Sequence, residues 1–328
     1  MKFFIAAVLA PASLVMSQEP QPLVIAHRGA SGYLPEHTLE AKAMAHAMSA
    51  AFIEQDVVLS KDAVPVVLHD IHVDTISDVA TRFPGRHRED GRFYALDFTL
   101  AELKELRVTE RFNALTGRQV FPKRFPVGRS TFRIPTLEEE IQLIQGLNQS
   151  TGREAGIYPE IKQPAWHRKE GHDISRIVLA VLEKYDYKTK DDACFLQCFE
   201  YEEVKRLRLE LGWKGRLIML LGGGSKGSDG TDFARLRSPA GLAELSGIVD
   251  GIGPSIGSVI GNDGKVTGLV RDAHAQGLKV HPYTLRTDEL PRFAKSADEL
   301  MQRLFRDAGV DGLFTDFPDV TLDWLKQK

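Results

Sequence analysis

The chain has 328 residues, of which 43% are hydrophobic and 27% are charged, and its formal net charge is −3 at pH 7. This composition is typical of a globular protein with a substantial core, and the slightly acidic balance argues against a nucleic-acid partner. The length fits one large barrel or two ordinary domains.

The N-terminus has the pattern of an export signal. Met1-Lys2 precedes an apolar run from Phe3 to Val15, and the residues that follow the run predict cleavage near Ser17. The run is too short for a membrane-spanning helix, and no Cys follows it that could carry a lipid anchor. We expect residues 1–17 to be a signal peptide and 18–328 to be the mature protein, exported to the periplasm or secreted, without stable membrane insertion. A buried first helix is the alternative.

Strand and helix patterns alternate from residue 23 onward. Strands are expected over 23–27, 52–59, 154–162, 195–199, 216–221, 248–254, 279–284 and 312–316. Helices are expected over 38–49, 173–185 and 200–211, and another begins after Thr136, which forms a capping box with Glu139. Eight strand–helix units predict a TIM (β/α)8 barrel, whose functional residues lie at the carboxyl ends of the strands.

The second strand continues into a predicted antiparallel arm. Two apolar runs flank Ser60-Lys61-Asp62-Ala63, which indicates two strands joined by a tight turn. A turn centred between Asp62 and Ala63 would place Asp56 opposite His69. Glu54 lies two residues before Asp56, so both carboxylates face the same way. These three side chains are compatible with a metal site, with an acid/base pair, and with the polar face of a solvated sheet.

The segment from about residue 71 to 133 interrupts the alternation directly after the predicted arm. It is too long for an ordinary loop between a strand and a helix. Residues 80–133 hold 12 Lys or Arg and 6 Asp or Glu. We expect a small inserted subdomain beside the barrel mouth, whose positive charge would favour an anionic substrate. A surface insertion with no role in binding is the alternative.

Two other patterns do not meet the requirements of the sites they suggest. The stretch from Gly222 to Ser228 lacks the Gly-Lys-Ser/Thr ending of a P-loop, so we interpret it as a flexible loop. Cys194 and Cys198 lie on a predicted strand roughly 13 Å apart, which is too far for a disulfide. Two thiols are also too few for a structural zinc site, so both cysteines are expected in the core.

Charged motifs mark three predicted strand ends. His27-Arg28-Gly29-Ala30 follows the first strand, Glu54-Gln55-Asp56 lies on the second, and Leu68-His69-Asp70 lies on its arm. Glu160-Ile161-Lys162 ends the next barrel strand. With the segment 31–39, these motifs resemble those of the glycerophosphodiester phosphodiesterase family, most closely its secreted bacterial branch. The resemblance covers nearly the whole chain after residue 22.

The resemblance implies a metal-dependent hydrolase in which Glu54, Asp56 and Glu160 bind one divalent cation. An all-oxygen ligand set suits Ca²⁺, Mg²⁺ or Mn²⁺ rather than zinc, and export favours Ca²⁺. His27 and His69 are the expected general acid and base, because histidine titrates near neutral pH. Which of the two protonates the leaving alkoxide stays open.

The resemblance also implies the groups that bind the substrate. Arg28 can hold two phosphate oxygens with its planar fork, and Lys162 adds a point charge. Phe199 and Tyr283 are expected to contact the glycerol moiety, with plain core aromatics as the alternative. One departure from the wider family is His37, which stands where Asn is commonest.

The implied reaction converts glycerophosphodiesters, such as glycerophosphocholine or glycerophosphoethanolamine, to sn-glycerol 3-phosphate and an alcohol. One alternative is a phospholipase C- or D-like barrel that acts on intact lipid, which would require an apolar rim. Another is a non-catalytic barrel that binds phosphoesters, which would lack one of the histidines or carboxylates. The expected partner is a small anionic phosphodiester, and a homodimer is compatible with the sequence.

Overall fold

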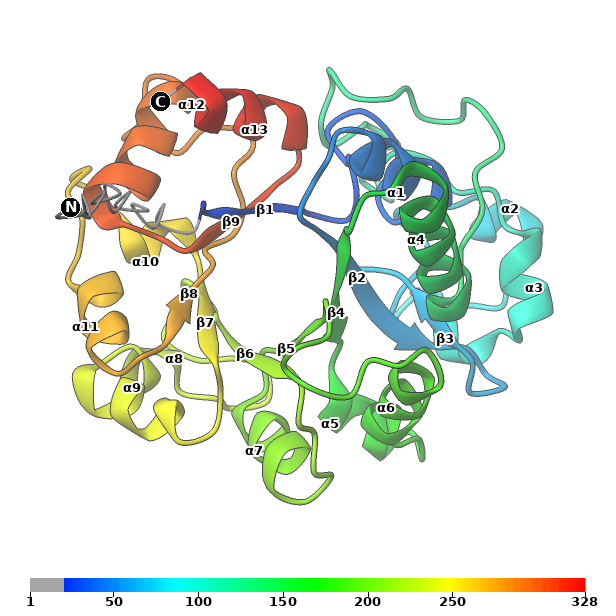
Figure 1. The fold of residues 1–328 in the computed structure, drawn as a ribbon. Coiled ribbons are helices and arrows are strands. Elements are labelled where there is room, and N and C mark those ends of the chain that lie inside the picture. Colours follow the sequence, from blue (N-terminus) through cyan, green and yellow to red (C-terminus); the bar gives the residue numbers. More distant parts are fainter. Residues whose placement is uncertain (1–20, 328) are drawn as a thin grey trace, which may run out of the picture.

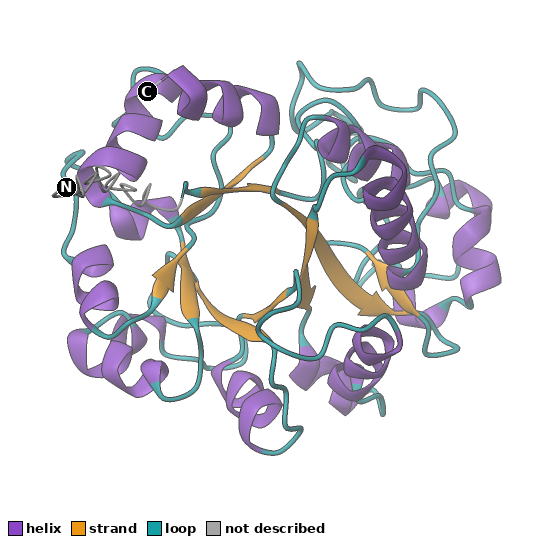
Figure 2. Cartoon of the chain, viewed as in Figure 1, coloured by secondary structure: helices purple, strands orange, loops and turns teal. Residues whose placement is uncertain are grey.

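The computed structural model describes residues 21–327, so the predicted signal peptide lies outside the described residues. Parallel strands enclose a barrel that is surrounded by helices (Figures 1 and 2). In chain order the barrel strands are β1 (Leu23–Ala26), β2 (Phe52–Leu59), β4 (Gly156–Ile161), β5 (Phe195–Cys198), β6 (Arg216–Leu221), β7 (Gly251–Pro254), β8 (Lys279–Val280) and β9 (Gly312–Thr315). A ninth strand, β3 (Pro65–Val67), is the antiparallel arm on β2.

The strands are ordered β8-β7-β6-β5-β4-β2-β1-β9, and the pairs between neighbouring barrel strands are parallel. Closure comes from the last segments of the chain, where Asp311 N donates to Val280 O and Phe314 N donates to Pro282 O, each at 3.0 Å. The predicted TIM barrel is therefore confirmed.

Helices cover the outside of the barrel. The longer ones are α1 (Leu39–Ala47), α4 (Leu137–Thr151), α6 (Ile174–Lys184), α7 (Tyr201–Leu209), α9 (Pro239–Ser246), α11 (Leu269–Ala275) and α13 (Pro318–Gln327). Shorter ones are α2 (Val79–Arg82), α3 (Leu100–Glu105), α5 (Pro164–Lys169), α8 (Phe233–Leu236), α10 (Ile256–Val259) and α12 (Ala297–Met301), with a 3₁₀ turn at Ala95–Asp97 and a π-helical stretch at Gln302–Ala308. The capping box of Thr136 and Glu139 is present at the start of α4, as predicted.

An apolar plug fills the barrel interior below the charged strand ends. It consists of Ile25, Phe52, Tyr158, Phe195, Ile218 and Phe314, all buried. The rings of Tyr158 and Phe195 are stacked with centroids 5.0 Å apart. Because side chains on one face of a strand recur every second residue, Phe52 packs into this plug while Glu54 and Asp56 face the same interior nearer the carboxyl end of β2.

The arm pairs one residue out of the predicted register. The carbonyl of Asp56 accepts a hydrogen bond from Leu68 N at 2.8 Å, so Asp56 lies opposite Leu68 and the predicted pairing with His69 is wrong. The reason is the turn: Ser60 N donates to Val64 O at 3.0 Å and closes a three-residue loop instead of a two-residue one. The arm ends at Val67, and His69 follows it as part of a turning segment.

The segment between β3 and α4 contains α2, the 3₁₀ turn and α3, and projects from one side of the barrel (right side of Figure 1). It has a hydrophobic cluster of its own, formed by Ile71, Val73, Ile76, Val79, Phe93, Ala95, Phe98, Leu103, Leu106, Val108, Phe132 and Ile134. This cluster packs on Val58, Val66 and Leu68. The segment, here called the insertion (residues 71–133), is therefore anchored directly on the β2–β3 arm.

Two predictions concern single features. Cys194 and Cys198 are free and buried, as expected for core residues. Within residues 21–327, no helix has the length and apolar character required to cross a membrane.

Candidate active site

Three buried carboxylates converge at the carboxyl ends of β2 and β4. Glu54 and Asp56 come from β2, and Glu160 of β4 is the registered neighbour of Asp56. Each residue offers one oxygen, and these oxygens lie within 4.8 Å of one another. Such an all-oxygen set fits a hard divalent cation, so the residues present suit the metal that the family resemblance implies.

Burial and mutual repulsion shape the charges of this cluster. Burial, followed by the charge of Asp56, raises the pKa of Glu54 well above its usual range. Burial likewise raises the pKa of Glu160 to about 8, although Lys162 lies 2.8 Å from it and opposes the shift. For Asp56 burial is outweighed by Lys162 and His37, which hold its pKa well below its usual range. Full ionisation of the cluster therefore needs additional positive charge.

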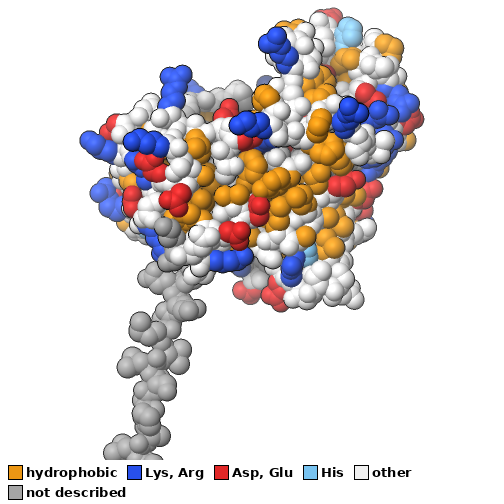
Figure 3. Space-filling view, turned by 90° about the horizontal axis from the view of Figure 1, so that it is seen from above, with side chains coloured by type: hydrophobic (Ala, Val, Ile, Leu, Met, Phe, Trp, Pro, Cys, Tyr) orange, Lys and Arg blue, Asp and Glu red, His pale blue; other side chains and the backbone are white. Residues whose placement is uncertain are grey.

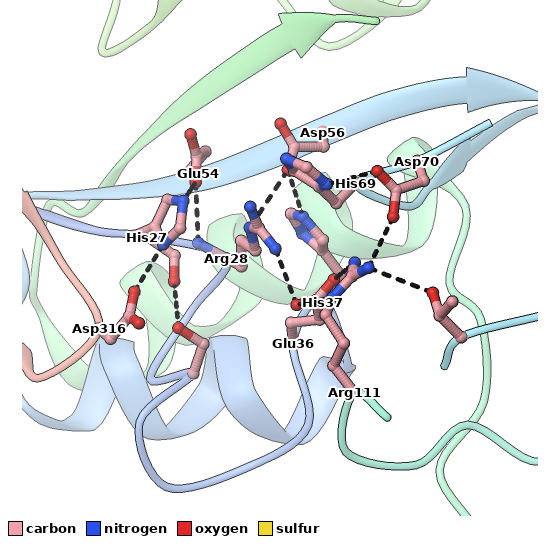
Figure 4. A network of polar contacts seen from close by, with 12 residues as sticks. His27, Arg28, Glu36, His37, Glu54, Asp56, His69, Asp70, Arg111 and Asp316 are labelled. Atoms are coloured by element: carbon pink, nitrogen blue, oxygen red, sulfur yellow. Dashed lines mark hydrogen bonds and ion pairs between the residues drawn. The ribbon is translucent and has the colours of Figure 1, made fainter. Parts of the chain in front are cut away.

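Each predicted catalytic histidine is paired with a carboxylate (Figure 4). Nδ1 of His27 lies 2.5 Å from Asp316 Oδ1, and Nδ1 of His69 lies 2.8 Å from Asp70 Oδ1. Because an ionised carboxylate only accepts hydrogen bonds, Nδ1 of each ring carries a proton. Nε2 is the remaining nitrogen, and in His27 it lies 3.8 Å from Glu54 Oε2, beside the carboxylate cluster.

Burial and neighbouring positive charges favour the neutral form of both histidines. Burial, with the charge of Arg28 second, lowers the pKa of His27 to about 4. The same two causes, in the same order, and then Lys162, lower the pKa of His69. The His69 side chain keeps 32% exposure, so solvent screens part of this effect at His69.

Arg28 joins the carboxylate cluster to the rest of the site. Its backbone has a left-handed φ of 58°, and its N–H donates to Glu54 Oε2 at 2.9 Å. Its side chain donates from Nη1 to Glu36 Oε2 at 2.8 Å. Among the described residues, the buried Nε has no hydrogen-bond partner and lies 3.6 Å from Asp56 Oδ2. A buried donor without a partner beside a cation site suits an anionic ligand oxygen.

A buried polar chain lies behind Asp56. Nε2 of His37 lies 2.7 Å from Asp56 Oδ2, and Nδ1 of His37 lies 3.1 Å from Lys42 Nζ. The same Nζ lies 3.0 Å from Glu140 Oε2 and donates to the carbonyl of Glu54. An ammonium has three donors and no acceptor, so Nδ1 of His37 must accept and Nε2 must donate to Asp56.

Several residues of the site were not predicted from the sequence. Asp316 and Asp70 hold the two histidines, and Gln197 donates to Glu54 Oε1 at 3.0 Å. Asp70 directly follows His69, and Asp316 ends a predicted strand, so both had a signal in the sequence. Arg111 and Arg124, which contact Asp70 and Asp316 from the insertion, had none because they are distant in the chain from every motif.

One cavity of about 440 Å³ unites most of the predicted residues. It is lined by His27, Arg28, Glu54, Asp56, His69, Glu160, Phe199 and Tyr283, among others. An adjoining cavity of about 250 Å³ shares His69, Glu160 and Phe199 and adds Lys162, Glu200 and Asp229. All nine predicted site residues therefore lie together. A larger cavity of about 760 Å³, at the other end of the barrel near Lys279 and His281, contains none of them.

Comparisons with known proteins agree with this geometry. Residues 27–320 match the model of the glycerophosphoryl diester phosphodiesterase family. The chain is 42% identical to a glycerophosphodiester phosphodiesterase of Haemophilus influenzae, over 93% of this chain and 90% of the relative. It is 37% identical to one of Treponema pallidum, over 96% and 94%.

Solved structures share the fold. One from Silicibacter pomeroyi has a TM-score of 0.71 and 25% identity, with 94% of this chain and 95% of that chain covered. An Oleispira antarctica phosphodiesterase, solved in complex with the product sn-glycerol-3-phosphate, has a TM-score of 0.62 and 22% identity, with 93% and 97% covered. The chain therefore belongs to the glycerophosphoryl diester phosphodiesterase family of enzymes.

Proposed function

We propose that the protein hydrolyses glycerophosphodiesters to sn-glycerol 3-phosphate and an alcohol, with Ca²⁺ as the resident cation. The observation that carries the proposal is one cavity holding three clustered carboxylates and two carboxylate-paired histidines. Relatives named as glycerophosphodiester phosphodiesterases and similar over nearly their whole length support the same reaction.

The proposed ligands of the cation are Glu54, Asp56 and Glu160. A bound cation supplies Lewis-acid polarisation of a phosphoryl oxygen and offsets negative charge. Arg28 and Lys162 would bind the remaining phosphate oxygens. Lys162 is suited to this because its carboxylate neighbours, despite its burial, keep its pKa above the usual value and the ammonium charged.

His27 and His69 are the proposed acid and base. In a neutral ring with its proton on Nδ1, Nε2 has a free lone pair. The base takes a proton from the attacking oxygen on this atom, and the acid, which must first hold a proton there, gives it to the departing alkoxide. The carboxylate on the other nitrogen stabilises the imidazolium formed in between. Both rings have a carboxylate partner on Nδ1. Kinetics with substrates of different leaving groups therefore assign which ring is the acid and which is the base.

Metal dependence and the histidine roles are tested with glycerophosphocholine. Chelator should abolish turnover and Ca²⁺ should restore it; full activity of a protein shown to be metal-free by elemental analysis would refute the metal role. His27→Ala and His69→Ala should each lose about 10²–10⁴-fold in rate. On a nitrophenyl diester, whose leaving group needs no protonation, only the variant lacking the acid should recover. Loss of no more than a few-fold in both variants would exclude catalytic histidines.

We place the alcohol part of the substrate in the adjoining cavity of about 250 Å³. It adjoins His69 but not His27, and the carboxylates of Glu200 and Asp229 line it beside the ring of Phe199. Carboxylates and an aromatic face suit an ammonium group, which supports choline or ethanolamine as the alcohol. Asp229→Asn with Glu200→Gln should raise KM for glycerophosphocholine and leave KM for glycerophosphoglycerol unchanged. Equal effects on the two substrates would contradict this placement.

No specific feature favours a phospholipase C- or D-like barrel acting on intact lipid, or a non-catalytic barrel that binds phosphoesters. In the described part of the chain, the exposed large hydrophobic side chains are Leu115, Val120, Leu209 and Val266, and none of them lines the cavity. On the face shown in Figure 3, hydrophobic side chains gather in a band across the middle, and Lys, Arg, Asp and Glu side chains lie around and between them. A non-catalytic binder would lack a histidine or a carboxylate, and all of them are present.

We further propose that residues 1–17 are removed during export to the periplasm or medium. The support is the charged start and the apolar run that precedes Ser17. N-terminal sequencing of the protein recovered from the periplasm should begin near Gln18. Recovery of the intact Met1 terminus from the cytoplasm alone would contradict it.

A further inference from the structure

The insertion sends one arginine to the partner of His27. The Arg124 side chain is only 4% exposed, and its Nη2 lies 2.7 Å from Asp316 Oδ2. The other oxygen of Asp316, Oδ1, is the one that contacts His27. Arg124 therefore binds the outer oxygen of the carboxylate whose inner oxygen orients the imidazole, and Nε of Arg286, from outside the insertion, lies 3.0 Å from the same outer oxygen.

A second arginine of the insertion does the same for His69. Nη1 of Arg111 lies 2.6 Å from Asp70 Oδ2, while Asp70 Oδ1 contacts His69. Arg111 also binds Glu36, with Nη2 2.5 Å from Oε1, and Glu36 in turn holds Arg28. Both histidines thus stand in the same series of an insertion arginine, a carboxylate and an imidazole.

The two arginines can orient the carboxylates that bind His27 and His69, which is more than anchoring the insertion on the barrel would require. A carboxylate bound through one oxygen can rotate, and the imidazole it orients can rotate with it. Binding the second oxygen fixes the plane of the carboxylate and therefore the direction of the Nδ1 hydrogen bond. The positive charge also keeps the carboxylate ionised: although burial opposes it, His27, Arg286 and Arg124 together hold the pKa of Asp316 below its usual range.

We propose that the insertion completes the acid/base apparatus, with Arg124 and Arg111 as positioning residues for His27 and His69. They act through Asp316 and Asp70 and do not touch the substrate. The inference rests on the proposed catalytic roles of the two histidines. The insertion, residues 71–133, would then help to position the catalytic histidines, in addition to any attraction of its net positive charge for an anionic substrate.

A double-mutant cycle tests the proposal. Arg124→Gln should lower kcat about 10–100-fold with little change in KM, an effect of the size seen when an outer partner of a metal ligand is removed. In a His27→Ala background the same substitution should cost less than about twofold, because the ring it positions is gone. In a His69→Ala background its full effect should remain. If the double variant loses kcat by the product of the two single-variant factors, the proposal is wrong.

Arg111→Gln provides the reciprocal cycle. Its kcat effect should vanish in His69→Ala and persist in His27→Ala. Its KM should also rise in every background, because Glu36 then holds Arg28 less firmly. A kcat effect of Arg111→Gln that is the same in both backgrounds would show that it does not act through His69.

Arg88 supplies the matched control. It belongs to the insertion and forms a fork-shaped pair with Asp97, both contacts at 2.8 Å, as Arg124 does with Asp288 at 2.8 and 3.0 Å. Arg88→Gln should leave kcat unchanged; a loss as large as that of Arg124→Gln would mean that only the integrity of the insertion matters. If Arg124→Gln does not fold, Arg124→Lys enters the same cycle, with thermal melting as the check. Full activity of His27→Ala itself would refute the proposed function instead.

Discussion

Asp316 and His27 are 289 residues apart in the chain, yet Asp316 Oδ1 lies 2.5 Å from His27 Nδ1. The contact follows from barrel closure, because β9 pairs in parallel with β1 and Ala26 is the neighbour of Thr315. Each residue therefore comes directly after one of two paired strands. In this position Asp316 fixes the tautomer of His27.

Asp316→Asn should test that relationship with little change of shape. The amide retains an oxygen that can accept from Nδ1, but it loses the charge that stabilises an imidazolium and it presents an N–H to Arg124. We expect kcat to fall by up to about 10⁴-fold, as when the carboxylate that orients a catalytic histidine becomes an amide, while Ca²⁺ affinity measured by titration calorimetry stays near that of the wild type. A loss of cation binding of similar size would place Asp316 in the metal site instead.

The chain behind Asp56 predicts a difference between two substitutions of His37. Asparagine can donate its side-chain N–H to Asp56 and accept from Lys42, whereas alanine can do neither. His37→Ala should weaken Ca²⁺ binding about 10–100-fold, and His37→Asn should retain most of the affinity. Calorimetric titration of metal-stripped protein measures both. Equal affinities for the two variants would contradict the hydrogen-bond role.

The Lys42–Glu140 pair predicts a large effect on stability. Both side chains are fully buried. Removing one partner leaves an uncompensated charge, so Lys42→Met should lower the free energy of unfolding by about 3–5 kcal/mol. Adding Glu140→Leu should recover much of this loss. Lys104→Met, which breaks the more exposed pair with Glu139, should change stability by less than about 1 kcal/mol. Urea unfolding of the four proteins provides the measurement.

Cation affinity should depend on pH because protons compete for the same oxygens. The raised pKa of Glu160, about 8 without metal, means that binding at neutral pH displaces a proton. The Ca²⁺ affinity should therefore fall as the pH is lowered from about 8 to about 6, by up to tenfold per unit for each displaced proton. In the metal-free protein, the same raised pKa contributes stability at low pH that is lost as the pH rises through about 8. Calorimetry in buffers of different ionisation enthalpy counts the protons, and a pH-independent affinity would exclude the competition.

The alternation of strand and helix patterns along the sequence was sufficient to predict the barrel. Its eight strands are short, apolar and flanked by capped helices, so local pattern and global fold agree. The two-residue spacing of Glu54 and Asp56 also predicted that both side chains face the same way on one strand, whereas their role as cation ligands was implied by the family resemblance and stays a prediction. The register of the β2–β3 arm could not, because the choice between a two- and a three-residue loop depends on the Ser60 turn and the left-handed Ala63, with φ of 59°.

The remaining parts of the site depend on tertiary contacts that no local pattern encodes. Arg111 and Arg124 lie in a segment without regular structure, between short bridges, and nothing around them in the sequence distinguishes them from the other ten basic residues of 80–133. Lys42 and Glu140 look like solvent-facing helix residues, and only the packing of α1 against α4 shows that both are buried.

Pairing of β1 with β9 also bears on the order in which the protein becomes active. His27 and all three clustered carboxylates leave the ribosome more than 150 residues before Asp316 does. A nascent chain that has already formed β1, β2 and β4 would carry the cation ligands while His27 still lacked the carboxylate that orients its ring. Turnover would then begin only when β9 pairs with β1 and closes the barrel. The onset of hydrolysis during refolding would therefore report when that last strand pairs.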